Sequence, residues 1–273
     1  MLGSIRLHID SFWHRVLRRP YLLAAPIDET FGDHYSVVML HGLGSIGAVW
    51  SDVASLLGDE GCRVMAFDLL GFGSSPKPDG PRYDVDDHAR AVIRSMAKRK
   101  IRRPVILVGH SMGCLIAVRV ARLRPDLVKH LILYEMPIYE GLPASRDYSL
   151  RRDFYFWLYN RIILNPNMLL DSPVLSSMVK KVGMILSSDT LAPLVLSLRH
   201  TIMEQRTLED MALVQAPMDV IYGALDLVVI RGNPTQVFAR VPAPLETHTK
   251  AHMHMLSRRA SKFIATRIMA AVK

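Results

Sequence analysis

The chain has 273 residues, of which 50% are hydrophobic and 22% charged, as in an ordinary globular protein. This composition excludes a disordered chain, and the length allows one large domain or a domain that carries an insertion. The formal net charge is +9, but the one basic cluster, at residues 94–103, lacks the interleaved aromatic residues of a nucleic-acid surface, so we expect no nucleic-acid partner.

The first twenty residues predict an amphipathic helix. Apolar residues recur at helical spacing between Leu2 and Leu17, with arginines among the intervening positions. Such a stripe packs on the protein's own body, which we favour, or rests on a membrane surface. The segment lacks a signal peptide's unbroken apolar core, and no apolar run reaches the ~18 residues of a membrane span. We therefore expect a cytoplasmic protein, with peripheral membrane contact through this helix as the alternative.

Short apolar runs bounded by turn residues alternate with longer amphipathic stretches up to residue 136. The runs predict buried strands at Tyr35–Leu40, Arg63–Phe67, Pro104–Val108 and His130–Tyr134, with another at Met218–Tyr222. The stretches between them predict helices near Ile46–Leu57, Asp84–Lys98 and Met112–Arg124. This alternation predicts an α/β fold with a mostly parallel central sheet and helices on both faces.

The alternation stops after Glu135. Up to about residue 210 the chain holds apolar and aromatic segments at helical spacing, interrupted by prolines, and no convincing buried strand. A structureless loop of this length would be unusual in a compact domain. We therefore predict a helical insertion at residues 137–210 within one α/β core formed by residues 1–136 and 211–273.

The clearest chemical motif is Gly109-His-Ser-Met-Gly113, which follows a predicted strand and opens a predicted helix. Glycine at both ends allows a turn so tight that a larger residue would clash. Ser111 is thereby expected on a strained corner above the sheet edge, where a serine nucleophile stands in some hydrolases. A tight turn with an incidental serine is the alternative interpretation.

This motif and three further segments resemble the α/β-hydrolase fold family, in its serine hydrolase branch of esterases and lipases. His41–Ser45 is similar to the family's oxyanion loop, Asp68–Ser75 to the turn after the next strand, and Tyr222–Asp226 to the strand end that carries the catalytic acid. The resemblance implies that residues 137–210 form a cap over the active site. It also implies no metal and no organic cofactor.

The resemblance assigns the oxyanion hole and two structural residues. Backbone N–H groups of Leu43 and Met112 are expected to bind the oxyanion. His41 is expected to brace its loop, and Asp68 to make local hydrogen bonds in a turn.

The same resemblance assigns the catalytic acid and base. Asp226 follows a buried strand and a glycine in the chain order Ser, Asp, His, while Glu135 is the alternative acid at the end of the preceding strand. Asp219 begins its strand, at the wrong edge of the sheet. His252 is the predicted base because it follows the small residue Ala251, and His254 is the alternative.

These residues predict two-step acyl transfer on a small, apolar, ester-like substrate. His252, oriented by Asp226, would take the proton of Ser111, which attacks the carbonyl before water releases the acyl group. Methionines and leucines in residues 137–210 suit acyl chains of up to medium length, so a carboxylester hydrolase is the main hypothesis. Lactonase, C–C bond hydrolase and acyltransferase activities use the same triad, and a non-catalytic ligand receptor is the alternative from another class.

Overall fold

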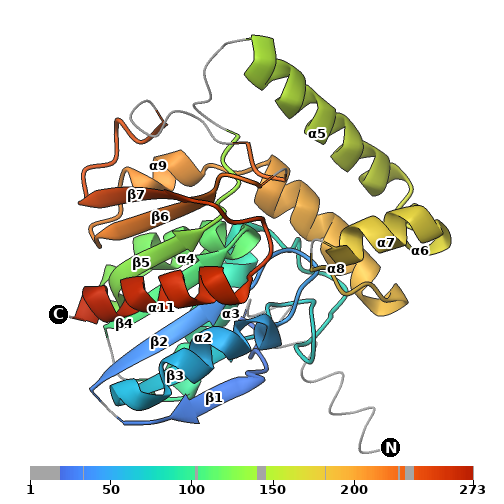
Figure 1. Ribbon diagram of the computed structural model, residues 1–273. Helices are drawn as coiled ribbons and strands as arrows, with labels where there is room; N and C mark the ends of the chain where they lie inside the picture. The colour runs from blue at the N-terminus through green and yellow to red at the C-terminus, as the bar shows by residue number, and fades with distance from the viewer. Residues whose placement is uncertain are drawn as a thin grey trace, which may run out of the picture.

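The structure is a computed structural model that describes residues 19–32, 34–101, 104–139, 146–181, 183–226, 228–230 and 237–272. The predicted helix in residues 1–20 therefore lies almost wholly outside the described residues. Within them the chain forms a seven-stranded sheet in the order β1-β3-β2-β4-β5-β6-β7 (Figure 1). Its strands are β1 (Ile27–Thr30), β2 (Tyr35–Leu40), β3 (Cys62–Phe67), β4 (Val105–His110), β5 (Val128–Tyr134), β6 (Met218–Gly223) and β7 (Leu245–Lys250).

All neighbouring strands from β3 to β7 pair in parallel, and β1 alone pairs antiparallel, with β3. The α/β fold class and the five predicted strands are confirmed, with ends displaced by at most two residues. The five predicted ranges leave out both edge strands, β1 and β7. The β1 segment Ile-Asp-Glu-Thr has one buried residue and three exposed ones, and no residue of β7 is classed as buried. An edge strand of this kind lacks the apolar run that marks a strand buried on both faces.

Helices cover both faces of the sheet. On one face α2 (Ser51–Leu56) and α11 (Arg258–Val272) pack over a core that includes Val37, Met39 and Ile132. On the other face α3 (Val85–Lys98) and α4 (Met112–Leu123) pack over Val38, Leu40 and Leu107. The predicted start of α3 is also confirmed, since the Asp84 carboxylate accepts a hydrogen bond from the Asp87 backbone N–H.

Between β5 and β6 the described residues are helical or irregular. The helices are α5 (Arg146–Leu164), α6 (Met168–Asp171), α7 (Pro173–Lys181), α8 (Leu191–Ser197) and α9 (Thr207–Met211), with short turns at Ser188–Thr190 and Leu198–Met203. The Ile185 N–H donates to the Gly44 carbonyl at 2.7 Å, so the segment after α7 lies directly on the loop that follows β2. None of the helices in the described ranges is long and apolar enough to span a bilayer.

The turn from β4 to α4 depends on close backbone approach. A Cβ atom added to Gly113 would lie 2.4 Å from the Leu40 carbonyl oxygen, and one added to Gly109 would lie 2.6 Å from the Cys114 backbone. Neither neighbour can rotate away, because both are main-chain atoms held in regular structure. The two glycines therefore let the turn sit against the end of β2.

We expect Gly113→Ala to destabilise the protein by about 3 kcal/mol, as overpacking against a fixed backbone does. Gly58→Ala is the matched control, because its added Cβ would first meet the ring of Phe31 at 3.6 Å. Chemical denaturation measures the free energy of unfolding of both variants. Equal stability of the two would contradict the packing described for the turn.

Candidate active site

Ser111 occupies the turn between β4 and α4 with a backbone φ of 51°, a left-handed conformation that is costly for a residue with a side chain. Its N–H donates to the Tyr134 carbonyl at 2.9 Å, which fixes the turn to the end of β5. The residue is 9% exposed. The structure thus places Ser111 on the strained corner that the sequence predicts.

Asp226 lies in the loop after β6, with its carboxylate held at both oxygens. Oδ1 accepts hydrogen bonds from the N–H groups of Val228 at 2.6 Å and Val229 at 3.2 Å. Oδ2 accepts a hydrogen bond of 2.9 Å from Nδ1 of His254. Burial alone would raise the pKa of Asp226, but hydrogen bonding and the charge of His254 outweigh it and lower the pKa to about 2. Asp226 is therefore ionised at neutral pH.

Glu135, the alternative acid, lies beside Asp226 rather than apart from it. It is fully buried at the end of β5, and its Oε1 accepts a hydrogen bond from the Gly223 N–H. Its proximity also contributes to the lowered pKa of Asp226. Glu135 therefore belongs to the same cluster as Asp226 and His254.

The structure does not pair Asp226 with His252, as the sequence predicts, but with His254. The carbonyl of His252 instead accepts a hydrogen bond from the Leu225 N–H at 3.0 Å. Its ring lines a hollow with Arg259 and Lys262, and burial, Arg259 and Lys250 lower its pKa. Nearby cations oppose the imidazolium that a general base must become. In this structure the imidazole paired with Asp226 is therefore that of His254.

Two residues that the sequence analysis did not single out hold the loop around His254. Nε2 of His110 hydrogen-bonds to the His254 carbonyl at 2.9 Å, and the two imidazole rings lie 4.9 Å apart. The Tyr134 hydroxyl donates to the Met253 carbonyl at 2.8 Å. Burial, foremost, and His254 lower the pKa of His110 to about 3, so it is neutral and donates through Nε2. In the sequence, the feature that indicates a role for His110 is its position directly before Ser111.

The predicted oxyanion loop lies next to Ser111. A Cβ atom added to Gly42 would be 3.1 Å from Cβ of Ser111, which brings Leu43 and Met112 to the same corner. His41 braces this loop as predicted: its Nδ1 hydrogen-bonds to the Gly42 carbonyl, and its Nε2 accepts from the Leu69 N–H at 2.9 Å. Burial lowers the pKa of His41 to about 4, so the ring is neutral.

Asp68 is also a structural turn residue, as predicted. Its two carboxylate oxygens accept hydrogen bonds from the N–H groups of Gly47 and Ser74, each at 2.7 Å. Its role is to join the loop after β2 to the turn after β3.

Apolar side chains from the inserted helices reach this corner. A Cβ atom added to Gly44 would meet side-chain atoms of Leu194 and Met184, each at 3.2 Å. On the inner side of α5 the Tyr159 hydroxyl lies 2.8 Å from that of Tyr139. Burial raises the pKa of Tyr159 to about 12, and the charge of Asp226 adds to the shift. Through Tyr159, the inner side of α5 therefore packs on Tyr139, in the segment that follows β5.

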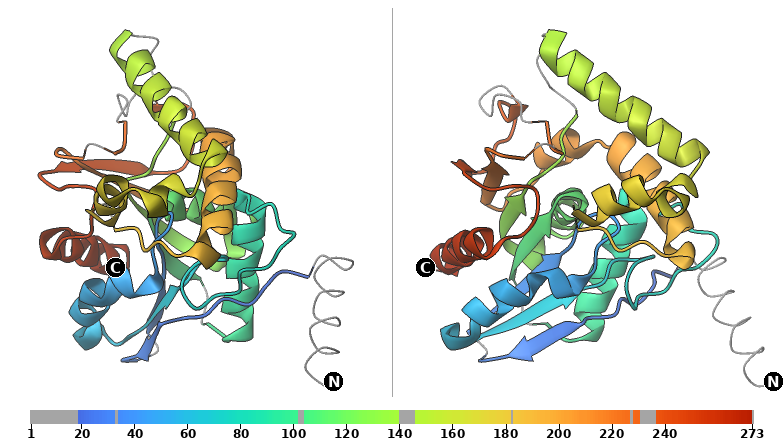
Figure 2. Two further views of the ribbon diagram at one scale, coloured as in Figure 1. Left: turned by 90° about the vertical axis from the view of Figure 1, so that its right-hand side faces the viewer. Right: turned by 45° about the vertical axis from the view of Figure 1, so that its right-hand side comes forward.

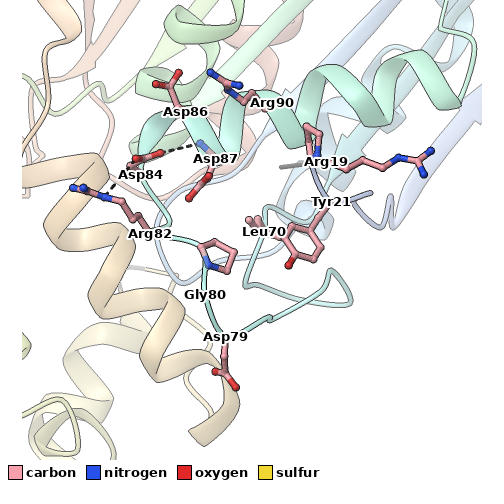
Figure 3. A pocket seen from close by; sticks show the side chains of 12 residues that line it. Arg19, Tyr21, Leu70, Asp79, Gly80, Arg82, Asp84, Asp86, Asp87 and Arg90 are labelled. Atoms are coloured by element: carbon pink, nitrogen blue, oxygen red, sulfur yellow. Dashed lines mark hydrogen bonds and ion pairs between the residues drawn. The ribbon is translucent and has the colours of Figure 1, made fainter. Parts of the chain in front are cut away.

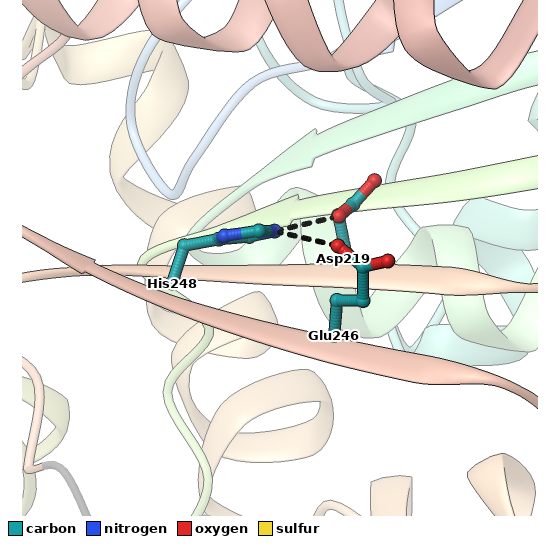
Figure 4. Close-up of side chains that lie close together, drawn as sticks. All are labelled: Asp219, Glu246 and His248. Carbon is teal, nitrogen blue, oxygen red and sulfur yellow. Dashed lines mark hydrogen bonds and ion pairs between the residues drawn. The ribbon is translucent and has the colours of Figure 1, made fainter.

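A second buried aspartate, Asp219, forms a separate cluster near the start of β6 (Figure 4). Its carboxylate accepts hydrogen bonds from Nε2 of His130 at 2.8 Å and from Nε2 of His248 at 2.7 Å, and from Arg267 at 3.0 Å. Burial would raise the pKa of Asp219, but these three partners lower it. Atoms that could serve as metal ligands, one each from Asp219, Glu246 and His248, lie within 4.8 Å of one another. Because the Arg267 guanidinium contacts both carboxylates, a cation already lies there and the cluster is a closed ion-pair network.

A hollow of about 870 Å³ opens at the N-terminal end of α3 (Figure 3). Its lining combines uncharged residues such as Tyr21 and Leu70 with seven charged ones, Asp79, Asp84, Asp86, Asp87, Arg19, Arg82 and Arg90. It contains neither Ser111 nor Asp226 nor His254, so it is not part of the site at the end of β4.

Comparison with known proteins agrees with this arrangement. Residues 35–183, more than half of the chain, match the family described as alpha/beta hydrolase fold. The fold and the strand–turn–helix that carries Ser111 thus define the class of protein. The chain belongs to the α/β-hydrolase fold family.

Two curated relatives and one solved structure illustrate the similarity. The chain is 35% identical over 116 residues to a probable lysophospholipase, BODYGUARD 4, of Arabidopsis thaliana, a match that covers 42% of this chain and 27% of that protein. It is 40% identical over 105 residues to a pimeloyl-[acyl-carrier protein] methyl ester esterase of Chromobacterium violaceum, covering 38% of each. The chain therefore spans less than half the length of these relatives. An enol-lactonase from Burkholderia xenovorans LB400 has the same fold, with a TM-score of 0.66 and 21% identity over 92% of this chain and 96% of that one.

The low pKa of Asp226 predicts a pH-dependent contribution to stability. A folded-state pKa of about 2, below the unfolded value near 4, stabilises the protein by roughly 2 kcal/mol at all pH values above about 4. The contribution is lost as the pH falls toward 2. We expect Asp226→Asn to unfold more easily than wild type at pH 7, and the difference in free energy of unfolding to narrow in urea titrations between about pH 4 and about pH 2, the range set by those two values.

Asp126→Asn is the matched control, because Asp126 pairs with Arg124 at the surface. The difference in free energy of unfolding between wild type and Asp126→Asn should stay below about 1 kcal/mol at every pH. If the stability difference between wild type and Asp226→Asn does not change with pH, Asp226 does not have the lowered pKa described above.

Proposed function

We propose that the protein is a serine hydrolase that cleaves carboxylic esters through a triad of Ser111, His254 and Asp226. The observation that carries the proposal is the hydrogen bond from Nδ1 of His254 to the buried, ionised carboxylate of Asp226. It leaves Nε2 of His254 as the basic nitrogen. Ser111 is the residue after His110, whose ring lies against the ring of His254.

The proposed mechanism has two steps. Nε2 of His254 takes the hydroxyl proton of Ser111 as its oxygen attacks the ester carbonyl, and the imidazolium is stabilised by Asp226. The N–H groups of Leu43 and Met112 stabilise the oxyanion. The imidazolium then protonates the leaving alcohol, and water attacks the acyl-enzyme by the same route in reverse. Glu135 and His110 are positioning residues that hold Asp226 and the loop of His254.

The proposed substrate is an ester with an apolar acyl group. Residues 137–210 would act as the cap. Two of their side chains, Met184 and Leu194, pack against Gly44 of the oxyanion loop, which supports an apolar entrance to Ser111. Of the other cap methionines, Met178 is 58% exposed on α7 and does not serve as lining. The printed names of the relatives, a lysophospholipase and a methyl ester esterase, are consistent with an ester bond as the target.

Replacement of the triad residues tests the reaction. We expect Ser111→Ala and His254→Ala each to lower kcat for p-nitrophenyl butyrate by roughly 10⁴-fold, because triad members act as a unit. His252→Ala should keep activity within about tenfold of wild type, since its ring faces cations rather than Asp226. A fluorophosphonate probe should label wild type and His252→Ala, but not Ser111→Ala. Activity that survives in His254→Ala and is lost in His252→Ala would restore the base predicted from the sequence.

An acyl-chain series tests the substrate class. We expect kcat/KM to rise from acetate to medium-chain p-nitrophenyl esters, because each buried methylene contributes about 0.8 kcal/mol. Met184→Trp should shift the preference to shorter chains by filling the approach, while Met178→Trp on the exposed side of α7 should not. Best hydrolysis of acetate by wild type would remove the medium-chain preference and leave the ester reaction in place.

A further inference from the structure

Helix α5 carries apolar side chains on two opposite sides. One side includes Tyr155, Tyr159 and Ile162, which pack against the body of the protein. The opposite side carries Leu150, Phe154, Trp157 and Leu164, which are 61%, 56%, 55% and 84% exposed; these four residues are called the outer stripe. At 3.6 residues per turn the four side chains point within about 80° of one another.

The outer stripe lies at the margin of the molecule. Figures 1 and 2 show α5 as the outermost helix in each view, with α6 and α7 continuing from its C-terminal end. On α7, Val174 and Met178 are also exposed, at 68% and 58%. Single exposed apolar residues are common, but four on one side of one helix mark an interaction surface.

Positive charge accompanies the outer stripe. Residues 146–185 contain six basic and three acidic residues, a local charge of +3 (6 − 3). The Arg161 guanidinium lies 5.6 Å from the ring centroid of Trp157, in the middle of the stripe, and the rings of Phe154 and Trp157 are stacked at 6.1 Å. Lys180 and Lys181 lie at the exposed end of α7.

We propose that the outer stripe docks on an anionic lipid bilayer. Aromatic and aliphatic side chains flanked by lysine and arginine are the pattern of a helix that lies in the membrane interface, with its apolar side in the acyl boundary and its cations at anionic headgroups. Phe154, Trp157 and Arg161 would suit a protein interface as well, but Lys180 and Lys181 favour the bilayer, because lysine is depleted in protein interfaces. The inner side of the same helix packs on the body of the protein, so docking would place the bilayer against the outer side of the inserted helices.

Vesicle co-sedimentation with the full chain tests the proposal. We expect wild type to bind vesicles of equal parts phosphatidylcholine and phosphatidylglycerol, to bind pure phosphatidylcholine much more weakly, and to be released by high salt. The double variant F154S/W157S should lose roughly tenfold in binding to the anionic vesicles. R161Q and K180Q/K181Q should lower binding to anionic vesicles only. Leu213→Ser is the matched control and should bind as wild type does, because Leu213 is 60% exposed but follows α9 and is not part of the outer stripe.

Further variants distinguish membrane docking by the outer stripe from membrane binding by another segment and from dimer formation. Ser111→Ala should bind vesicles as wild type does, so a failure of the hydrolase proposal does not affect this result. The proposal is overturned if F154S/W157S binds as wild type while F12S/W13S in the predicted N-terminal helix does not. It is also overturned if wild type binds neither vesicle, or if sedimentation shows a dimer that F154S/W157S converts to a monomer without any vesicle binding.

Discussion

The hydrogen bond between His254 and Asp226 determines how the rest of the proposed site is built. A carboxylate that is buried and ionised is stable only if its oxygens are fully hydrogen-bonded. In this protein two backbone N–H groups hold one oxygen and the imidazole of His254 holds the other. Glu135, directly after β5, lies beside this carboxylate. Each of these contacts comes from the carboxyl end of a strand or the loop beyond it, where parallel α/β folds gather functional residues.

Strand β6 carries two buried aspartates with different surroundings. Asp219, near its start, is saturated by two histidines and an arginine that join β5, β7 and α11. Asp226, beyond its end, has a single histidine whose second nitrogen is not taken by the carboxylate. The first arrangement stabilises a corner of the sheet, and the second leaves a basic nitrogen for chemistry. The partners of a carboxylate, rather than its burial, distinguish the two roles.

The sequence predicted the parts of the site that depend on local backbone geometry. The glycines around Ser111 mark a close approach to β2, and that constraint is visible in five consecutive residues. The strands buried on both faces were predicted for the same reason, since their apolar runs are continuous. His252 and His254 are only two residues apart, and the local property used to separate them, the small residue Ala251 before His252, does not decide which of them reaches Asp226. The choice depends on long-range contacts: the His252 carbonyl binds the Leu225 N–H, while the His254 carbonyl binds His110. Edge strand β1 was missed because it carries no apolar run.

The central claim is that His254, held by Asp226, is the base for Ser111. A crystal structure of the covalent adduct with a fluorophosphonate tests it most directly, because the phosphorus marks the position of the tetrahedral carbon. The account predicts phosphorus bonded to Oγ of Ser111, a phosphoryl oxygen that accepts hydrogen bonds from the N–H groups of Leu43 and Met112, and Nε2 of His254 facing the adduct. An adduct that contacts His252 instead, or one attached to another residue, would contradict it.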